Sequence, residues 1–191
     1  ERDFNHPAII GWCPLNETAN NQIPEFVRLL AATTRAIDPT RPFIDASGWK
    51  HLVGVTDIMD SHFYDQDPAA LAARLEPLKR GEDIDLYPWA NSEKGKPVFI
   101  SEYGGIRWAQ SDFGWGYGNA ATSKEEFIER YSGLTKVLQD NPKCWALCYT
   151  QLYDVEQEQN GLYLYDRSDR FTEDEKKKLC EIMSRKAAVE E

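Results

Sequence analysis

Short apolar segments alternate with helical patterns along this chain, and the alternation limits the folds that it can adopt. Between the apolar segments, apolar residues recur at intervals of three and four, as on one face of a helix. Strands that alternate with helices are typical of βα units on a parallel sheet. The sequence therefore predicts an α/β fold. The predicted strands are residues 8–15, 42–46, 57–62, 97–101 and 144–150.

The helical segments carry recognisable start signals. Prolines, which lack an N–H and suit a first helical turn, stand at positions 24 and 68, the second directly after the capping residue Asp67. Ser123 and Thr172 each stand three residues before a glutamate, the spacing of a capping box. We expect four helices, each burying one apolar stripe against the sheet.

The net charge of −10 excludes two classes of partner. The 191 residues include 32 acidic and 22 basic side chains, and the basic ones form no cluster that could bind phosphate groups. We expect no nucleic-acid partner and no membrane partner, since no apolar run is long enough to span a bilayer. The four cysteines lack the spacing of a zinc site, and we expect free thiols and a cytoplasmic location.

Two glutamates, Glu17 and Glu102, directly follow predicted strands. Side chains alternate along a strand, so Glu17 shares a face with Leu15, and Glu102 shares one with Ile100. A charge at the end of an apolar row loses hydration unless it is paired. One such glutamate is usually the first polar residue of a loop, but two at equivalent positions suit glycoside hydrolysis, which uses a pair of carboxylates.

Several segments resemble one enzyme family. Residues 5–17 (NHPAIIGWCPLNE) resemble the acid/base motif of glycoside hydrolase family 2, the β-galactosidase and β-glucuronidase family, and residues 100–105 (ISEYGG) resemble its nucleophile motif. Residues 60–64 (DSHFY) resemble the end of barrel strand six, and parts of 148–167 resemble strand eight with its loop. The resemblance implies a partial TIM (β/α)8 barrel, strands four to eight, as a single fragment of residues 1–191.

The resemblance also implies catalytic roles. Glu102 is expected to be the nucleophile of a retaining β-glycosidase, and Glu17 the acid that becomes the base in the second step. Retention predicts that their carboxyl groups lie roughly 5 to 5.5 Å apart. Asn16 is expected to donate to the sugar 2-hydroxyl, and Tyr64 to hydrogen-bond the nucleophile.

Other residues are weaker candidates for binding a carbohydrate substrate. Trp49 and Trp108 could stack on a pyranose ring, His62 could bind a hydroxyl, and Tyr149 lies in the strand-eight motif. A core or loop-anchoring role is an alternative for Trp108, as is a structural role for His62. The three histidines show no metal-ligand spacing, so no metal and no cofactor is predicted.

The matched motifs correspond to strands four to eight, and the family's strands one to three have no counterpart here. We therefore expect a fragment of a larger enzyme that is poorly active alone and is stabilised by self-association or by the N-terminal part of its parent chain. Residues 151–167 contain no lysine, unlike the Asn-x-Lys carboxylate-binding motif of the family's β-glucuronidases, which favours neutral β-galactoside-like sugars. The alternative is an inactive carbohydrate-binding or structural fragment.

Overall fold

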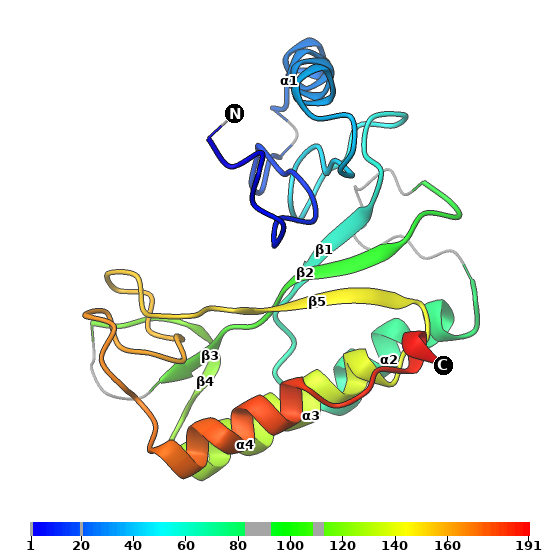
Figure 1. Ribbon diagram of the computed structural model, residues 1–191. Helices are drawn as coiled ribbons and strands as arrows, with labels where there is room; N and C mark the ends of the chain where they lie inside the picture. Colours follow the sequence, from blue (N-terminus) through cyan, green and yellow to red (C-terminus); the bar gives the residue numbers. More distant parts are fainter. Residues whose placement is uncertain (1, 20, 83–92, 109–112) are drawn as a thin grey trace. The chain divides into compact units, whose positions relative to one another are not determined.

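The computed structural model describes residues 2–19, 21–82, 93–108 and 113–191 (Figure 1). The chain divides into two compact units. The first contains the described residues up to His62 and those from 93 to Ser101, and the second contains Phe63–Glu82 and the described residues from Glu102 to Glu191. The expectation of a single domain over residues 1–191 stays a prediction.

The first unit has one helix, α1 (Pro24–Ile37), among its described residues. It begins at the predicted proline and ends before Pro39, as expected. Its buried residues Val27 and Ala31 pack with Phe43 and Val55 in the core of this unit. This core fixes the segment that follows Phe43, and that segment contributes to the site described below.

Two predicted strands of the first unit, residues 8–15 and 42–46, do not form as continuous strands. They are replaced by two isolated bridges between parallel segments. Pro14 has no N–H to donate, so the ladder of hydrogen bonds is interrupted between the bridges. The prediction of parallel pairing is confirmed and that of continuous strands is wrong. The bridged pairs are Trp12 with Phe43 and Asn16 with Ser47.

The other three predicted strands form one sheet in the order β1, β2, β5. Their bounds are Met59–Phe63 for β1, Val98–Gly104 for β2 and Cys144–Thr150 for β5. The β2 strand continues beyond its predicted end at residue 101, so Glu102 lies within the strand. The boundary between the two units falls inside β1 and inside β2.

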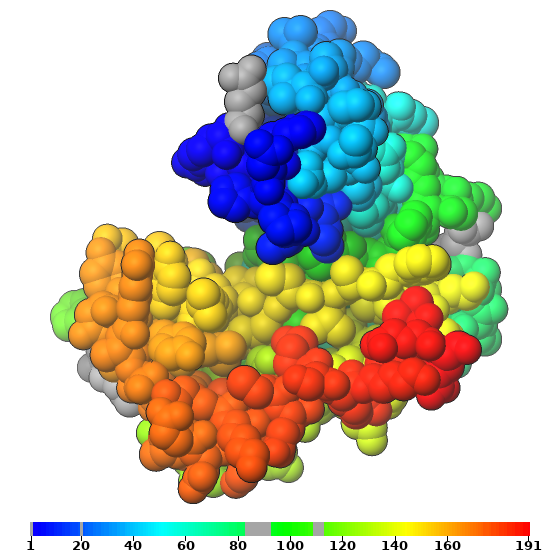
Figure 2. Space-filling view, viewed as in Figure 1, coloured from blue at the N-terminus to red at the C-terminus, as the bar shows by residue number. Residues whose placement is uncertain are grey.

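The helices of the second unit are α2 (Pro68–Lys79), α3 (Lys124–Gln139), α4 (Glu173–Met183) and the short 3₁₀ helix η1 (Ala188–Glu190). Helix α3 packs against both α2 and α4 (Figure 1). The Asp67 side chain caps α2 as predicted. In Figure 2, residues of β5 (yellow) and α4 (orange to red) form part of the surface of this unit.

The two predicted capping boxes have different outcomes. At α4, Thr172 and Glu175 exchange both hydrogen bonds, which confirms the prediction. At α3, the Ser123 side chain accepts from the Glu126 N–H, but the Glu126 carboxylate accepts from Thr122 instead of from the Ser123 backbone. The Thr122 hydroxyl is the reason, because it offers this carboxylate a second hydrogen bond.

Replacing Thr172 with alanine is expected to lower the free energy of unfolding by about 1 kcal/mol, because the Glu175 N–H loses its acceptor at the start of α4. Denaturant titration measures this difference. Lys177→Ala, on the exposed face of the same helix, is the matched control and is expected to leave the stability within about 0.5 kcal/mol of the parent. Equal losses in both variants would contradict a capping role.

The described residues between 103 and 122 include two short parallel strands, β3 (Ile106–Trp108) and β4 (Tyr117–Ala121). The glycines of this segment gave no strand signal in the sequence. Three of them, Gly104, Gly105 and Gly118, have positive φ values, which glycine adopts without strain. In the described part of the chain, no helix is long and apolar enough to cross a membrane.

Candidate active site

The backbone around Glu17 is held by the segment that contains Ser47. The Glu17 N–H donates to the Ser47 carbonyl at 2.7 Å, next to the bridge between Asn16 and Ser47. Glu17 has a φ of +50°, in the left-handed region that few residues other than glycine occupy. Backbone strain of this kind concentrates at functional sites. Here it sets the direction in which the Glu17 side chain leaves the chain.

The Glu17 carboxylate is paired with a histidine. Its Oε1 lies 2.7 Å from Nδ1 of His62, whose side chain is completely buried, whereas the Glu17 side chain is 29% exposed. The other ring nitrogen, Nε2, lies 2.7 Å from the Ser47 hydroxyl oxygen. Gly48 makes room for this ring, since a Cβ at that position would lie 2.6 Å from it. Both nitrogens of His62 therefore have protein partners within the first unit.

A second histidine of the first unit, His51, is buried between two aspartates. Its Nδ1 lies 2.6 Å from an Asp45 oxygen, and its Nε2 lies 2.9 Å from an Asp60 oxygen. Burial lowers the pKa of His51, but the hydrogen bonds and the charges of Asp45 and Asp60 outweigh it and raise this pKa to about 10. His51 is therefore an imidazolium at neutral pH. These three residues, the His51 cluster, were not recognised in the sequence.

The second unit holds the other glutamate. Glu102 lies in β2, and its carboxylate accepts a hydrogen bond from the Tyr64 hydroxyl, as the sequence predicted. Burial and the neighbouring Glu102 raise the pKa of Tyr64, so the phenol keeps its proton and remains a donor. The Tyr64 ring stacks on Tyr117 with centroids 3.5 Å apart. A side chain at Gly105 would collide with Tyr117, which explains glycine there.

Trp108, a candidate for sugar stacking, has the core role that was its alternative. It is 6% exposed and packs against Phe127 and Phe171. The guanidinium of Arg170 also lies 5.3 Å from its ring. The aromatic side chains of α3 and of the segment before α4 therefore bury this indole.

Tyr149, predicted to bind substrate, also lies in the core of the second unit. It is 8% exposed, and its hydroxyl accepts from the Ile106 N–H and donates to the Asn160 carbonyl. These two bonds connect β5 with the segments around it. Asn16 and Trp49, the remaining candidates, belong to the first unit, where Asn16 is exposed and Trp49 is half-buried.

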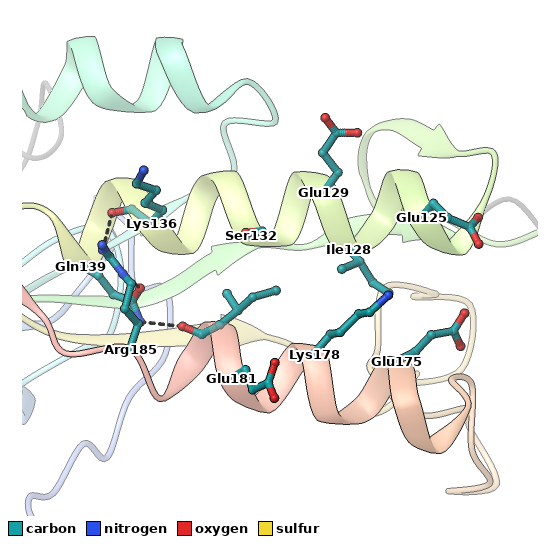
Figure 3. A pocket seen from close by; sticks show the side chains of 11 residues that line it. Glu125, Ile128, Glu129, Ser132, Lys136, Gln139, Glu175, Lys178, Glu181 and Arg185 are labelled. Atoms are coloured by element: carbon teal, nitrogen blue, oxygen red, sulfur yellow. Dashed lines mark hydrogen bonds between the residues drawn. The ribbon is translucent and has the colours of Figure 1, made fainter.

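The two units each contain a hollow. In the first unit, a hollow of about 370 Å³ is lined by polar groups of Asn16, Ser47, Asp60 and Ser101 among apolar side chains. In the second unit, a groove of about 610 Å³ lies between α3 and α4, where charged side chains such as Glu129, Lys178 and Glu181 line it (Figure 3). None of the predicted site residues lines that groove, so the first hollow is the one of interest.

The predicted catalytic pair is divided between the units, with Glu17 in the first and Glu102 in the second. Each is paired with a side chain of its own unit, Glu17 with His62 and Glu102 with Tyr64. The expected separation of the two carboxylates stays a prediction, as does the absence of a metal or cofactor.

Sequence comparisons identify related proteins. Residues 1–142 match the family described as "Glycosyl hydrolases family 2, TIM barrel domain". A β-glucuronidase from Paenibacillus borealis is 34% identical over 113 residues, which cover 54% of this chain and 18% of that protein. A β-glucuronidase from Sus scrofa is 28% identical over 114 residues, which cover 54% of this chain and 16% of that protein. The chain thus spans less than a fifth of these curated relatives.

Solved structures share the fold. The β-glucuronidase of Bifidobacterium dentium, solved with coumarin-3-O-glucuronide, has a TM-score of 0.64 and 19% identity, over 95% of this chain and 32% of that chain. The β-galacturonidase of Eisenbergiella tayi, bound to glycerol, has a TM-score of 0.67 and 17% identity, over 97% of this chain and 35% of that chain. Because the family match covers most of the chain, we conclude that it belongs to glycosyl hydrolases family 2 through that family's TIM barrel domain.

Proposed function

We propose that this chain carries the catalytic residues of a retaining β-glycosidase. The observation that carries the proposal is that both glutamates of the family motifs have a dedicated partner: the Tyr64 hydroxyl donates to Glu102, and His62 contacts Glu17. Such partners hold a carboxylate in one orientation, which catalysis by a positioned group requires. In this proposal β1, β2 and β5 correspond to strands six, seven and eight of the family's barrel, and the bridged segments around Trp12 and Phe43 to strands four and five.

In the first step, the Glu102 carboxylate attacks the anomeric carbon and forms a covalent glycosyl ester. The bond to the leaving-group oxygen breaks as Glu17 transfers its proton to that oxygen. The Tyr64 hydroxyl, hydrogen-bonded to Glu102, keeps the attacking carboxylate in place. Asn16 donates to the sugar 2-hydroxyl, an interaction that strengthens as the ring approaches an oxocarbenium ion.

In the second step, Glu17 acts as the base. It removes a proton from water, the water oxygen attacks the anomeric carbon, and the ester bond to Glu102 breaks. Two displacements at one carbon return the β configuration, and both glutamates regain their starting protonation states.

Two observations point to different sugars. The absence of lysine from residues 151–167 favours a neutral β-galactoside. The relatives named above act on uronic acids by their names, as β-glucuronidases and a β-galacturonidase, which favours a sugar with a carboxylate. We propose a carbohydrate as the substrate and leave the choice to an assay that contains both types of sugar.

The test is hydrolysis of aryl β-galactoside, β-glucuronide and β-galacturonide by the natural protein that contains this chain, and by the 191-residue chain alone. A 2-fluoro sugar of the preferred type is expected to label Glu102, and Glu102→Gln is expected to abolish the label. Robust turnover by the chain alone would contradict the expected need for further chain or self-association. Sugar binding without turnover or labelling in the natural protein would overturn the proposal in favour of the carbohydrate-binding alternative.

A further inference from the structure

A line of polar contacts leads from Glu17 into the first unit. Beyond the contact of His62 Nε2 with Ser47, the Ser47 hydroxyl oxygen lies 3.4 Å from that of Ser101. The Ser101 hydroxyl in turn donates to Oδ2 of Asp60. We call Ser47, Ser101 and Asp60 the polar line. It joins the ring of His62 to a carboxylate that is 1% exposed.

The chemistry of its end group gives the polar line a direction. A carboxylate accepts hydrogen bonds and donates none, so the single hydroxyl hydrogen of Ser101 is committed to Asp60. The Ser101 oxygen is then an acceptor for the Ser47 hydroxyl. If Ser47 donates to Ser101, its own oxygen accepts a hydrogen from Nε2 of His62. If Ser47 instead donates its hydrogen to Nε2, no hydrogen remains for a bond between the Ser47 and Ser101 oxygens.

We propose that the polar line keeps His62 protonated on Nε2, so that its Nδ1 and the Glu17 carboxyl group hold one proton between them. Ser47, Ser101 and Asp60 are thus positioning residues that act on Glu17 through His62. The role of Glu17 as an acid rests on the proposed function, whereas the protonation of His62 rests on the contacts alone.

This arrangement serves both steps of the proposed reaction. A neutral ring protonated on Nε2 presents a lone pair on Nδ1, which accepts a hydrogen bond from the protonated form of Glu17. When Glu17 has given its proton to the leaving group, this lone pair faces a carboxylate oxygen, an unfavourable contact. When Glu17 takes a proton from water in the second step, this unfavourable contact is removed. The polar line therefore favours the return of Glu17 to its acid form.

Asp60 is held firmly enough to act as the fixed end. Its Oδ2 also accepts from the Gly48 N–H at 3.0 Å, and the charged His51 lies 2.9 Å from its Oδ1. A carboxylate that accepts from a backbone N–H and contacts an imidazolium is held in one orientation. The His51 cluster therefore anchors the polar line at the end remote from Glu17.

Nuclear magnetic resonance of the histidine rings tests the proposal, because the chain has only three histidines. The 191-residue chain is labelled with ¹⁵N-histidine and measured at pH 7, and the His62 signals are assigned by their loss in His62→Gln. We expect these signals to show a proton on Nε2 of His62. In Ser101→Ala, the Ser47 hydroxyl loses its acceptor and turns to Nε2, so the proton is expected to move to Nδ1. Ser101→Thr keeps a hydroxyl and is expected to restore the parent pattern.

Ser61→Ala is the matched control, since Ser61 is a buried serine beside His62 whose hydroxyl has no hydrogen-bond partner among the described residues. It is expected to leave the His62 pattern unchanged. An unprotonated Nε2 in the parent, or the same pattern in the parent and Ser101→Ala, would overturn the proposal.

A kinetic measurement separates this inference from the proposed function. In the active natural protein, Ser101→Ala is expected to lower kcat about fivefold for poor leaving groups with little change in KM, as for the loss of one hydrogen bond that supports a general acid. An unchanged kcat with a shifted ring pattern would refute the catalytic role of the polar line. If the parent shows no turnover but Nε2 of His62 is protonated, the proposed function is refuted and the inference about His62 protonation still holds.

Discussion

Replacing Glu102 with alanine is expected to lower kcat of the natural protein by roughly 10⁴-fold or more, because the variant has no carboxylate that can form the glycosyl ester. The matched variant, Glu17→Ala, is expected to behave differently. It loses the acid, so hydrolysis of substrates with poor leaving groups fails. Substrates whose aryl group leaves without a proton still form the glycosyl ester on Glu102. This ester then accumulates, because no base activates water.

Added azide separates the two roles by the configuration of the product. In Glu102→Ala, the small anion occupies the space of the missing carboxylate, attacks the anomeric carbon once, and gives an α-glycosyl azide. In Glu17→Ala, azide attacks the ester on Glu102 and gives a β-glycosyl azide after two displacements. The product configuration, read from its proton coupling constants, thus identifies which residue is the nucleophile.

Ser61→Ala, remote in role from both carboxylates, serves as the control for expression and folding. If both glutamate variants gave the same azide product, or if Glu102→Ala kept the parent rate, the assigned roles would be wrong. If Glu17→Ala hydrolysed substrates with good and poor leaving groups at the same rate, Glu17 would not be the acid.

The sequence was sufficient for residues whose signal is local. Pro24 and Asp67 mark helix starts, so position in the chain alone predicts their place in an element. Glu17 and Glu102 end apolar runs, but Glu102 lies inside β2 and no continuous strand precedes Glu17. The hydrogen bond between Tyr64 and Glu102 was predicted through the family motifs, which record a contact between distant segments.

The polar line and the His51 cluster could not be predicted in this way. Ser47 and Ser101 are 54 positions apart in the sequence and meet only through the tertiary structure. One signal was present: Asp45 and Asp60 stand inside or beside apolar strand segments, where a carboxylate must find a partner. The sequence does not say that the partner is His51.

Two of the aromatic candidates, Trp108 and Tyr149, are buried among other aromatic side chains. Trp108 and Tyr149 have sequence neighbours that suit a site, yet α3 brings Phe127 against both rings. An aromatic residue near a catalytic motif can serve the core as well as the sugar, and only tertiary packing distinguishes the two. Trp49, which is half-buried, keeps its predicted role as a proposal.

Replacing His51 with alanine is expected to lower the free energy of unfolding by about 3 to 5 kcal/mol at pH 6, because two buried aspartates lose the cation between them. The exposed His6→Ala is the matched control and is expected to change the stability by less than about 0.5 kcal/mol. Denaturant titrations of the three proteins measure these differences.

The pH dependence of this loss follows from the raised pKa of His51. The pKa is about 10 in the folded chain against its ordinary value of 6.5, so the folded state binds the proton more tightly than the unfolded state. The stabilisation is complete below pH 6.5 and falls by about 1.4 kcal/mol per pH unit as the pH rises toward 10. The difference in free energy of unfolding between parent and His51→Ala should therefore narrow over this range. The same difference between parent and His6→Ala should stay constant.

A gap that stays constant from pH 6 to pH 10 would mean that His51 contributes packing alone and carries no charge. In that case Asp60 would lack its cationic partner, and the anchor proposed for the polar line would be lost with it. The second expected observation is a changed His62 ring pattern in His51→Ala, measured where this variant is folded. If the difference in free energy of unfolding also narrows as expected, the two results together connect the stability of the His51 cluster to the protonation of His62, which contacts Glu17.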